Sequence, residues 1–257
     1  MRRQVAFPGM ASLSVPVHPA QMPRRPRLHI SSMPQHVVQR GNNRATCFRS
    51  DEDRRHYLRW LADAAGRCGC HIHAYVLMTN HVHLLLTGDS DTSIPGLMQS
   101  LGTRFARYVN RRYERTGTLW EGRYHASLVD SESYLLGCMR YIEANPVRAA
   151  IAASPAAYRW SSFRCNAMGE TDERITPHPA YEKLGDRPEA RCAAYTLLFE
   201  QALPAEELAC IRDSTRGGLP TGSDAFREWV AARLGSVAVP LKRGRPVARR
   251  GEGINRL

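Results

Sequence analysis

The chain is 257 residues long and 43% hydrophobic, which is enough apolar material for a packed core and well above the composition of a disordered chain. It carries 36 Lys and Arg against 24 Asp and Glu, a formal net charge of +12, and this excess fits a polyanionic partner such as nucleic acid. No run approaches about 18 uninterrupted apolar residues and no apolar signal core is visible, so we expect neither a membrane-spanning helix nor export.

The seven cysteines are an odd number and are scattered through mostly apolar stretches. Cys68 and Cys70 are separated by one residue, which is too close for a zinc clamp, and no second pair accompanies them. The pattern indicates reduced, mostly buried thiols, as is usual for a cytoplasmic protein.

The positive charge is unevenly distributed. Residues 1–33 are rich in Pro, contain five Arg and no acidic residue, and predict a disordered basic arm, with Met22 as an alternative start. Residues 240–257 carry six basic residues against one acidic residue and predict a disordered basic tail. Residues 34–168 contain 17 basic and 11 acidic residues, so this segment is also positively charged. Residues 169–239 contain 8 basic and 12 acidic residues and are negatively charged. We expect the first of these two segments to be the main domain and the second a helical region.

Hydrophobic periodicity predicts an alternation of strands and helices over the first part of the chain. In chain order we expect a strand over 36–40, a helix from 50, strands over 71–78 and 81–87, a helix over 94–115, a strand over 124–129, and a helix capped by Ser131 that ends at Asn145. The order β-α-β-β-α-β is that of the ferredoxin-like split βαβ fold, so we predict an α+β protein with an antiparallel sheet. The last helix is an addition to that core, and Pro146 should end it.

From about residue 170 the periodicity is helical. We expect helices over 181–184, 190–202, 205–213 and 224–234, the last of them capped by Ser223. In this last helix Phe226, Trp229, Val230 and Leu234 form an apolar stripe, which we expect to be buried.

Two histidines on one predicted strand are the first candidate site residues. His81 and His83 are two residues apart, so their imidazoles project from the same face and suit two ligand positions of a divalent cation. The same spacing fits an exposed polar face, although Leu85 shares that face and makes the alternation only partly polar. His71 and His73 repeat the spacing on the neighbouring strand, where we expect a structural role.

A tyrosine and an amide on the added helix form the second candidate. Tyr141 and Asn145 are four residues apart and therefore share a helix face. A phenol has a pKa near 10 and needs a positively charged site to act as a nucleophile at neutral pH. Tyr134, seven residues before Tyr141 on the same face, is the competing candidate. Paired histidines holding a metal, a tyrosine and a neighbouring amide would form a phosphodiester-cleaving site.

These residues belong to longer stretches that match a known family. His81-Val82-His83 resembles the HUH motif (His, hydrophobic, His) of single-strand DNA endonucleases, and residues 141–149 resemble the tyrosine helix of bacterial REP-associated tyrosine transposases. Further stretches match that family in the same order: 36–44, 120–124 and 158–163. The resemblance covers roughly residues 22–246, and its specificity comes from the ordered set because each motif alone is weak.

The resemblance implies a single-strand DNA endonuclease that cuts and rejoins DNA at palindromic repeat hairpins, with residues 34–168 as its catalytic domain. Tyr141 would be the nucleophile, and a Mg²⁺ or Mn²⁺ ion would be held by His81, His83 and Asn145. Attack would give a covalent 5′-phosphotyrosine and a free 3′-hydroxyl, and the 3′-hydroxyl of another strand can reverse the step. Asn145 stands where mobile insertion-sequence relatives generally carry Gln, which bears on how tightly this third ligand holds the metal.

The partner implied is single-stranded DNA folded into hairpins, bound by a monomer or a homodimer in the nucleoid. Arginines spaced three and four residues apart along the 94–115 helix could track a phosphate backbone, although a solvated helix face has the same pattern. Residues 243–246 resemble an AT-hook core, which places arginines in the minor groove. The residues expected to contact DNA are Arg40, Asn42, Arg104, Arg107, Arg111, Arg123, Arg148, Lys242, Arg243 and Arg245.

Two other functions fit parts of the pattern. A non-catalytic hairpin-binding protein derived from such a transposase would have no need of the two histidines, Tyr141 and Asn145 together. A histidine-triad nucleotide hydrolase would need a further histidine where the sequence has Leu85.

Overall fold

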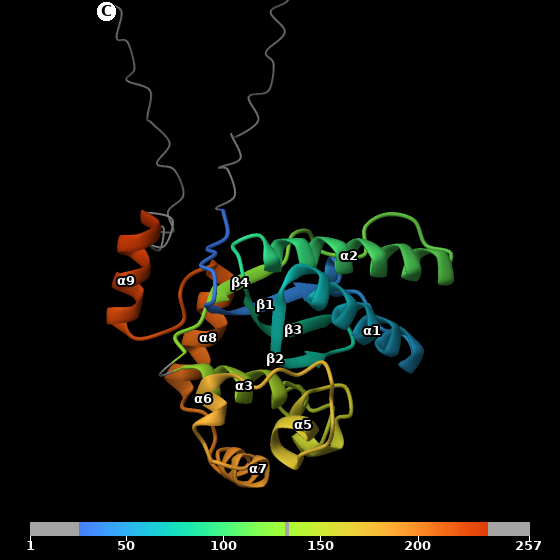
Figure 1. Ribbon diagram of the computed structural model, residues 1–257. Helices are drawn as coiled ribbons and strands as arrows, with labels where there is room; N and C mark the ends of the chain where they lie inside the picture. The colour runs from blue at the N-terminus through green and yellow to red at the C-terminus, as the bar shows by residue number, and fades with distance from the viewer. Residues whose placement is uncertain (1–25, 132–133, 236–257) are drawn as a thin grey trace, which may run out of the picture.

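The computed structural model describes residues 26–131 and 134–235. Within them, the centre is an antiparallel sheet of four strands (Figure 1), namely β1 (Pro34–Arg40), β2 (Cys70–Leu77), β3 (His81–Gly88) and β4 (His125–Leu128). The strand order is β2-β3-β1-β4. Because α1 (Asp51–Cys68) joins the first two strands and α2 (Ser93–Arg112) joins the last two, the chain has the predicted ferredoxin-like α+β fold.

Helices α1 and α2 cover one face of the sheet. Val37, Leu84 and Leu86 alternate toward these helices and are buried in one cluster with Leu61 of α1 and Phe105 of α2. This apolar layer is the larger of the two that enclose the sheet.

Helix α1 begins at the acidic segment, as predicted. Oγ of Ser50 accepts a hydrogen bond from the backbone N–H of Asp53 at 3.3 Å, and Oδ2 of Asp53 accepts one from the backbone N–H of Ser50 at 2.9 Å, which completes a capping box. Asp53 also accepts hydrogen bonds from the hydroxyls of Tyr108 and Tyr113 at 2.9 and 2.8 Å. The cap of α1 therefore also fastens α1 to α2.

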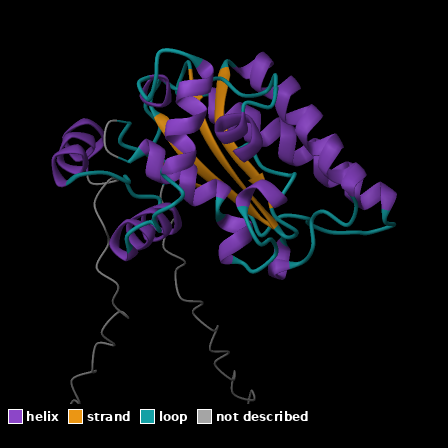
Figure 2. Ribbon diagram, turned by 90° about the horizontal axis from the view of Figure 1, so that it is seen from below, coloured by secondary structure: helices purple, strands orange, loops and turns teal. Residues whose placement is uncertain are grey.

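The other face of the sheet is covered by helices that follow β4, so that helices flank the sheet on both sides (Figure 2). The first is α3 (Leu135–Glu143), whose Cys138 and Ile142 are buried with Val76 and Leu85 of the sheet. Beyond it come α4 (Asn145–Arg148), α5 (Phe163–Met168), α6 (Pro179–Glu182) and α7 (Pro188–Leu197). The chain then returns to α3 and β4 through α8 (Ala205–Gly217), and the last helix of the described residues is α9 (Asp224–Leu234). Two 3₁₀ turns, η1 (Asn42–Arg44) and η2 (Pro155–Ala157), lie in the connections.

The N-terminal boundary predicted from composition is wrong for the residues that are described. Leu28 and Ile30 are buried against Leu128 of β4 and Val230 of α9, so residues 26–33 are packed rather than part of a disordered arm. The rest of that arm and residues 236–257 lie outside the described part of the chain.

Two expectations about the helices are also corrected. Helix α3 begins at Leu135 without a side-chain cap, so Ser131 does not cap it. In α9 Ser223 is the cap, as predicted, but Trp229 is 45% exposed, and within the predicted stripe Val230 is the residue that is fully buried. Among the helices that the structure describes, none is both long and apolar enough to cross a membrane.

Candidate functional site

The register of the sheet gathers histidines on the face that α3 covers. Strand β1 pairs with β3 so that Val38 lies opposite His83 and Arg40 lies opposite His81. Directly opposed residues of an antiparallel pair project to the same face. His36, two residues before Val38, therefore joins the two histidines of β3 on this face.

Helix α3 brings Tyr141 to these histidines. Its ring centroid is 5.7 Å from that of His36 and 5.8 Å from that of His83, and the side chain is 8% exposed. Asn145 begins α4, and its Nδ2 lies 3.0 Å from Nε2 of His83. The ring centroids of His81 and His83 are 5.0 Å apart. The structure thus brings together the four residues that the sequence spacing singled out.

A buried glutamate holds the end of α3. Glu143 accepts hydrogen bonds from Oγ of Ser162 at 2.5 Å, Nδ2 of Asn166 at 2.8 Å and the hydroxyl of Tyr195 at 2.8 Å. Complete burial raises the pKa of Glu143 to about 7 although these three donors act in the opposite direction. Helix α3 ends at this residue and Pro146 lies in the first turn of α4, which confirms the predicted break.

A chain of hydrogen bonds connects His83 to the C-terminal helices. Nδ1 of His83 is 2.8 Å from Nε2 of His36, and Nδ1 of His36 is 2.8 Å from Oγ1 of Thr215 in α8. The hydroxyl of Thr215 donates to the backbone carbonyl of Ile211 at 2.8 Å. Neither His36 nor Thr215 was predicted from the sequence as a site residue. Strand alternation could have indicated His36, but no local signal points to Thr215, which is 179 residues away from it.

Burial keeps the three histidines neutral. It lowers the pKa of His36 to about 3 and that of His81 to about 4, and it lowers the pKa of His83 well below its ordinary value. The nearby charges of Arg148 and Arg40 act in the same direction. All three imidazoles are therefore uncharged at pH 7, which is the form in which a histidine binds a metal ion.

The donor atoms fit a divalent metal ion when the amide is included. Within residues 26–131 and 134–235, no three or more His, Cys, Asp or Glu side chains are placed to hold a metal together. Asn145 can complete a set with His81 and His83, because turning its amide by about 180° brings Oδ1 instead of Nδ2 beside His83. Nδ1 of His81 is 2.7 Å from Oδ1 of Asn80, which leaves Nε2 for a metal. Two imidazole nitrogens and one amide oxygen would leave further coordination positions open for phosphate or water.

Arginines surround the open side of the site. A pocket of about 380 Å³ next to His83 and Tyr141 is lined by four of them, Arg40, Arg44, Arg212 and Arg216. A fifth, Arg148, lies with Cζ 4.2 Å from the centroid of the Tyr141 ring and donates to the Tyr141 carbonyl. This concentration of positive charge would attract a phosphate to the tyrosine.

Tyr134, the competing nucleophile, does not line this pocket. It precedes the first residue of α3 and is partly buried at the edge of the cluster that contains Leu135. Burial raises the pKa of its hydroxyl, and the neighbouring Cys210 acts in the same direction. Geometry and charge therefore both favour Tyr141.

The site lies within a segment of known family. Residues 29–145 match the family model described as "Transposase IS200 like". This segment is therefore similar to IS200-like transposases. It contains His36, His81, His83, Tyr141 and Asn145, whereas the Thr215 hydroxyl that completes the hydrogen-bond chain is contributed from beyond it.

Two solved structures are similar to this chain. One is a REP-associated tyrosine transposase bound to a REP hairpin, with 16% identity, a TM-score of 0.47, and coverage of 62% of this chain and 96% of that chain. The other is a protein of Deinococcus radiodurans R1 assigned as a transposase, with 20% identity, a TM-score of 0.35, and coverage of 51% and 99%. A search of the curated proteins gave no significant match.

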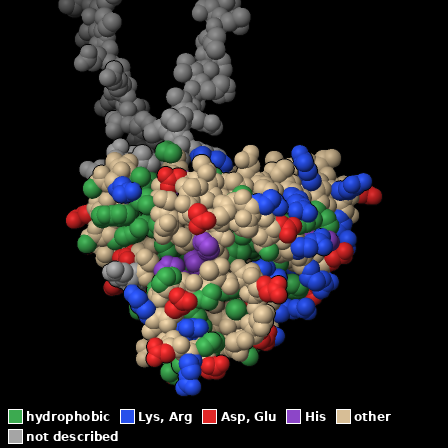
Figure 3. Space-filling view, viewed as in Figure 1, with side chains coloured by type: hydrophobic (Ala, Val, Ile, Leu, Met, Phe, Trp, Pro, Cys, Tyr) green, Lys and Arg blue, Asp and Glu red, His purple; other side chains and the backbone are tan. Residues whose placement is uncertain are grey.

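The residues expected to contact DNA are divided between the two sides of the sheet. Arg40 and Arg148 lie at the pocket of Tyr141, and Asn42 lies in η1 just beyond β1. The three arginines of α2 belong to the layer on the opposite side of the sheet. Lys and Arg side chains gather over the α1–α2 end of the face shown in Figure 3, and histidines reach the surface near its middle.

The members of the α2 stripe differ in their contacts. Arg104 forms an ion pair with Asp63 at 3.3 Å, and its Cζ lies 4.6 Å from the centroid of the Trp60 ring. Its guanidinium group therefore contacts α1 within the fold. Arg107 lines a cavity between α2 and the segment before β4, and Arg111 is exposed. Of the remaining candidates, Arg123 lines the same cavity, and the candidates at 242, 243 and 245 lie outside the described residues.

The second histidine pair has structural contacts. His73 is buried, with Nδ1 2.7 Å from the carbonyl oxygen of Thr176 and Nε2 2.8 Å from Oγ1 of Thr87. His71 is exposed and its Nε2 lies 3.0 Å from Oδ1 of Asp89. These contacts agree with the structural role expected for both.

Proposed function

We propose that this transposase domain is a divalent-metal-dependent single-strand DNA transesterase that cuts and rejoins DNA at palindromic hairpins. The observation that carries the proposal is the meeting of Tyr141 with His81, His83 and Asn145 on one face of the sheet, beside an arginine-lined pocket. A protein that only bound hairpins would use the arginines but would have no need of these four side chains.

In the proposed step the phenol oxygen of Tyr141 attacks a phosphorus atom of the DNA strand. A bond forms between these two atoms, the bond from phosphorus to the 3′-oxygen breaks, the phenol proton passes to solvent, and the 3′-oxygen takes up a proton. The products are a 5′-phosphotyrosine and a free 3′-hydroxyl. Because one phosphodiester is exchanged for another, a 3′-hydroxyl of a second strand can reverse the step without a nucleotide energy source.

The side chains around Tyr141 would bind and orient the phosphate. His81, His83 and Asn145 would hold the metal ion, which supplies Lewis-acid polarisation of the scissile phosphate when it is bound. The pocket arginines would balance the negative charge of the phosphate in the transition state. Arg148, packed on the Tyr141 ring, would keep the phenol in place.

Single-stranded DNA is the substrate that suits the access to Tyr141. The side chain is 8% exposed and lies in a pocket on the helix-covered face of the sheet, where a stacked duplex would have difficulty bringing its backbone to the phenol. The hairpin part of the proposal follows from the sequence resemblance to REP-associated tyrosine transposases.

Incubating the full chain and Mn²⁺ with single-stranded hairpin oligonucleotides from its own genome tests the proposal. The expected products are a strand ending in a 3′-hydroxyl and protein joined to the other fragment, with neither formed in chelator. A fully paired duplex of the same sequence is the control and should be cut far less. Hairpin binding without any cutting would contradict the proposal and indicate a non-catalytic binding protein, and equal cutting of the duplex would contradict the proposed substrate.

A further inference from the structure

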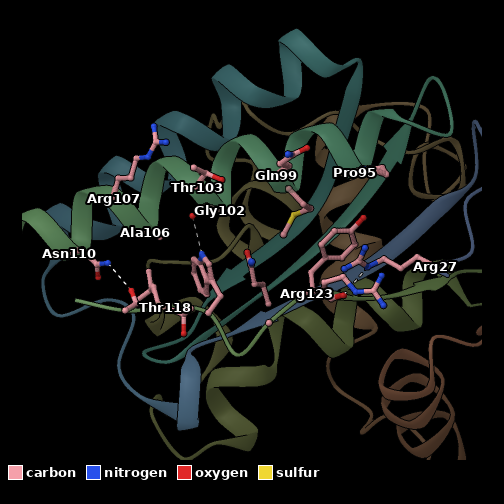
Figure 4. Close-up of a pocket in the computed structure, with 17 residues that line it drawn as sticks. Arg27, Pro95, Gln99, Gly102, Thr103, Ala106, Arg107, Asn110, Thr118 and Arg123 are labelled. Atoms are coloured by element: carbon pink, nitrogen blue, oxygen red, sulfur yellow. Dashed lines mark hydrogen bonds between the residues drawn. The ribbon is translucent and has the colours of Figure 1, made fainter. Parts of the chain in front are cut away.

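A cavity of about 760 Å³ lies between α2 and the segment that precedes β4 (Figure 4). One face of α2 forms its first wall, from Pro95 through Gly102 to Asn110, and residues 117–124 form the second. Nδ2 of Asn110 donates to the carbonyl of Gly117 at 2.9 Å and joins the two walls at one end. The volume falls within the range of about 300–1,000 Å³ that is usual for small-molecule sites.

The cavity has apolar walls and one unsatisfied polar group. Met98, Trp120 and Tyr124 supply apolar surface. Gln39 also lines the cavity, is 7% exposed, and its Oε1 has no hydrogen-bond partner within the described part of the chain. Buried carbonyl oxygens are costly to leave without a donor, so an unpaired one on a residue that lines a cavity suits a ligand with an N–H group.

Arginines at both ends of the cavity suit a ligand that carries phosphate. Arg107 lies at the end near Asn110, and Arg27 and Arg123 lie at the other end (Figure 4). Arg27 is fixed by a hydrogen bond from Nε to the carbonyl of Tyr124 at 3.0 Å, and its Cζ lies 3.7 Å from the centroid of the Tyr124 ring. Aromatic surface beside positive charge is the combination that proteins use to hold single-stranded nucleic acid.

A third hollow borders both the cavity and the pocket of Tyr141. This hollow of about 490 Å³ shares Arg27, Arg123 and Tyr124 with the cavity. The same hollow shares three further residues with the pocket of Tyr141, namely Glu121, His125 and Arg216. The shared residues therefore define one arginine-rich path past β4, from the cavity on the α2 side of the sheet to the tyrosine on the α3 side.

We propose that this cavity binds one unpaired nucleobase of the same DNA strand whose phosphate is presented to Tyr141. The base lies between α2 and residues 117–124, the two walls of the cavity. Oε1 of Gln39 accepts a hydrogen bond from an amino or imino N–H of the base. The adjoining phosphates follow the arginines along the path toward Tyr141. The inference rests on the proposed function for its substrate, but it concerns recognition rather than cutting.

The test measures binding in chelator, so that no cutting is needed. The probe is a fluorescently labelled hairpin oligonucleotide with unpaired flanks, and each unpaired nucleotide is replaced in turn by an abasic site. At one flank position we expect the abasic site to weaken binding by the native chain about tenfold, as loss of one stacked and hydrogen-bonded base should. In Gln39→Leu the same abasic site should weaken binding clearly less than in the native chain, because the leucine has already removed the hydrogen bond and only the stacking contacts remain to be lost.

Gln35→Leu is the matched control, because Gln35 lies two residues before Val37 on the same face of β1 as Gln39 but does not line the cavity. This variant should keep the tenfold abasic penalty. Gln39→Leu removes an unpartnered buried oxygen and should leave the melting temperature unchanged or higher. Photocrosslinking of 5-iodouracil at the sensitive position to Trp120 or Tyr124 gives a second readout in the native chain.

Two results would overturn the inference: an abasic penalty at no unpaired position, or the same penalty in Gln39→Leu as in the native chain. These results are separable from failure of the proposed function. Base-dependent binding without any cutting would reject the transesterase and keep the cavity assignment, whereas cutting without base dependence would reject the cavity assignment alone.

Discussion

His83 can offer one ring nitrogen to a metal ion, and residues on two other elements determine which one. The single hydrogen of the Thr215 hydroxyl is donated to the Ile211 carbonyl, so its oxygen accepts from Nδ1–H of His36. Nε2 of His36 then has a lone pair and accepts from Nδ1–H of His83. Nε2 of His83, the atom beside Asn145, is left with the lone pair that a metal requires.

Replacing Thr215 by Val should therefore weaken metal binding without touching a metal ligand. We expect Mn²⁺ affinity, measured by titration calorimetry without DNA, to fall about tenfold, as is usual when a partner of a ligating histidine is removed. Thr215→Ser keeps the hydroxyl and should bind Mn²⁺ like the native chain. Equal affinities in Thr215→Val and the native chain would show that the hydrogen-bond chain does not orient His83.

Replacing His81 or His83 by Ala should abolish cutting of hairpin DNA and leave hairpin binding largely intact, because phosphate contacts come mainly from arginines. Cleavage assays and fluorescence anisotropy on the same preparations measure the two properties. His71→Ala is the control, since His71 is exposed and contacts Asp89. Full cutting by the His81/His83 double variant in chelator would refute the metal assignment.

At the scale of single residues, the sequence was informative where contacts are local or periodic. The spacing of two in a strand and of four along a helix predicted the pairs His81/His83 and Tyr141/Asn145, and the structure brings the two pairs together. Thr215 could not be predicted in this way, because its position depends on how α8 packs against β4 and α3. Periodicity within a segment carries no information about such packing.

Among the elements, β2 contains a β-bulge whose extra residue is held by side-chain hydrogen bonds. The register between β2 and β3 shifts between Ile72 and Ala74, which leaves His73 as the extra residue of a bulge. Its imidazole is buried between Thr87 of β3 and the carbonyl of Thr176. The histidine thus connects the bulge to the chain between α5 and α6.

This histidine should make stability depend on pH. Burial lowers the pKa of His73 to about 4 from an ordinary value of 6.5, so the folded chain holds it neutral while the unfolded chain protonates it. Its contribution is full above pH 6.5 and is lost as the pH falls toward 4, by up to about 3 kcal/mol. Urea unfolding at pH 7 and pH 4.5 should show that His73→Gln loses less stability over this range than the native chain.

His71→Gln, at an exposed position two residues earlier, is the control for this measurement and should follow the native chain. An identical pH dependence in His73→Gln and the native chain would mean that other groups dominate the titration.

Element boundaries were predictable where a specific residue starts or stops an element. The capping box at Ser50, the cap at Ser223 and the break before Pro146 are all found in the structure. The start of α3 was wrong, because a serine before an apolar run is a frequent signal and here Tyr134 occupies the cap position. The buried stripe of α9 was also wrong, since a short helix at the end of the fold has few surfaces to pack against.

For the whole molecule, composition predicted disorder at both basic ends, and this is wrong for residues 26–33. Leu28 and Ile30 pack against β4 and α9, although their segment is dominated by Pro and Arg. Composition cannot show that two apolar residues will be covered by elements about 100 and 200 residues later in the chain. We propose that residues 34–168 form the catalytic unit and that the following helices complete it through Thr215.

The C-terminal tail should add affinity rather than discrimination. Deleting residues 240–257 removes six basic residues and one acidic residue. Binding should weaken for all DNA sequences, and the dependence of log K on log salt should become shallower by up to about one unit per lost phosphate contact. Anisotropy titrations at several salt concentrations measure both. Unchanged affinity together with lost discrimination between hairpins would mean that the tail reads the DNA.

Tyr141 should become covalently joined to DNA, and peptide mapping of the product identifies the attached residue. The native chain is incubated with Mn²⁺ and a hairpin substrate, digested with protease and nuclease, and analysed by mass spectrometry. We expect a nucleotide attached to the peptide that contains Tyr141, no adduct from Tyr141→Phe, and a normal adduct from Tyr134→Phe. A nucleotide on the Tyr134 peptide, or an adduct that persists in Tyr141→Phe, would contradict this assignment.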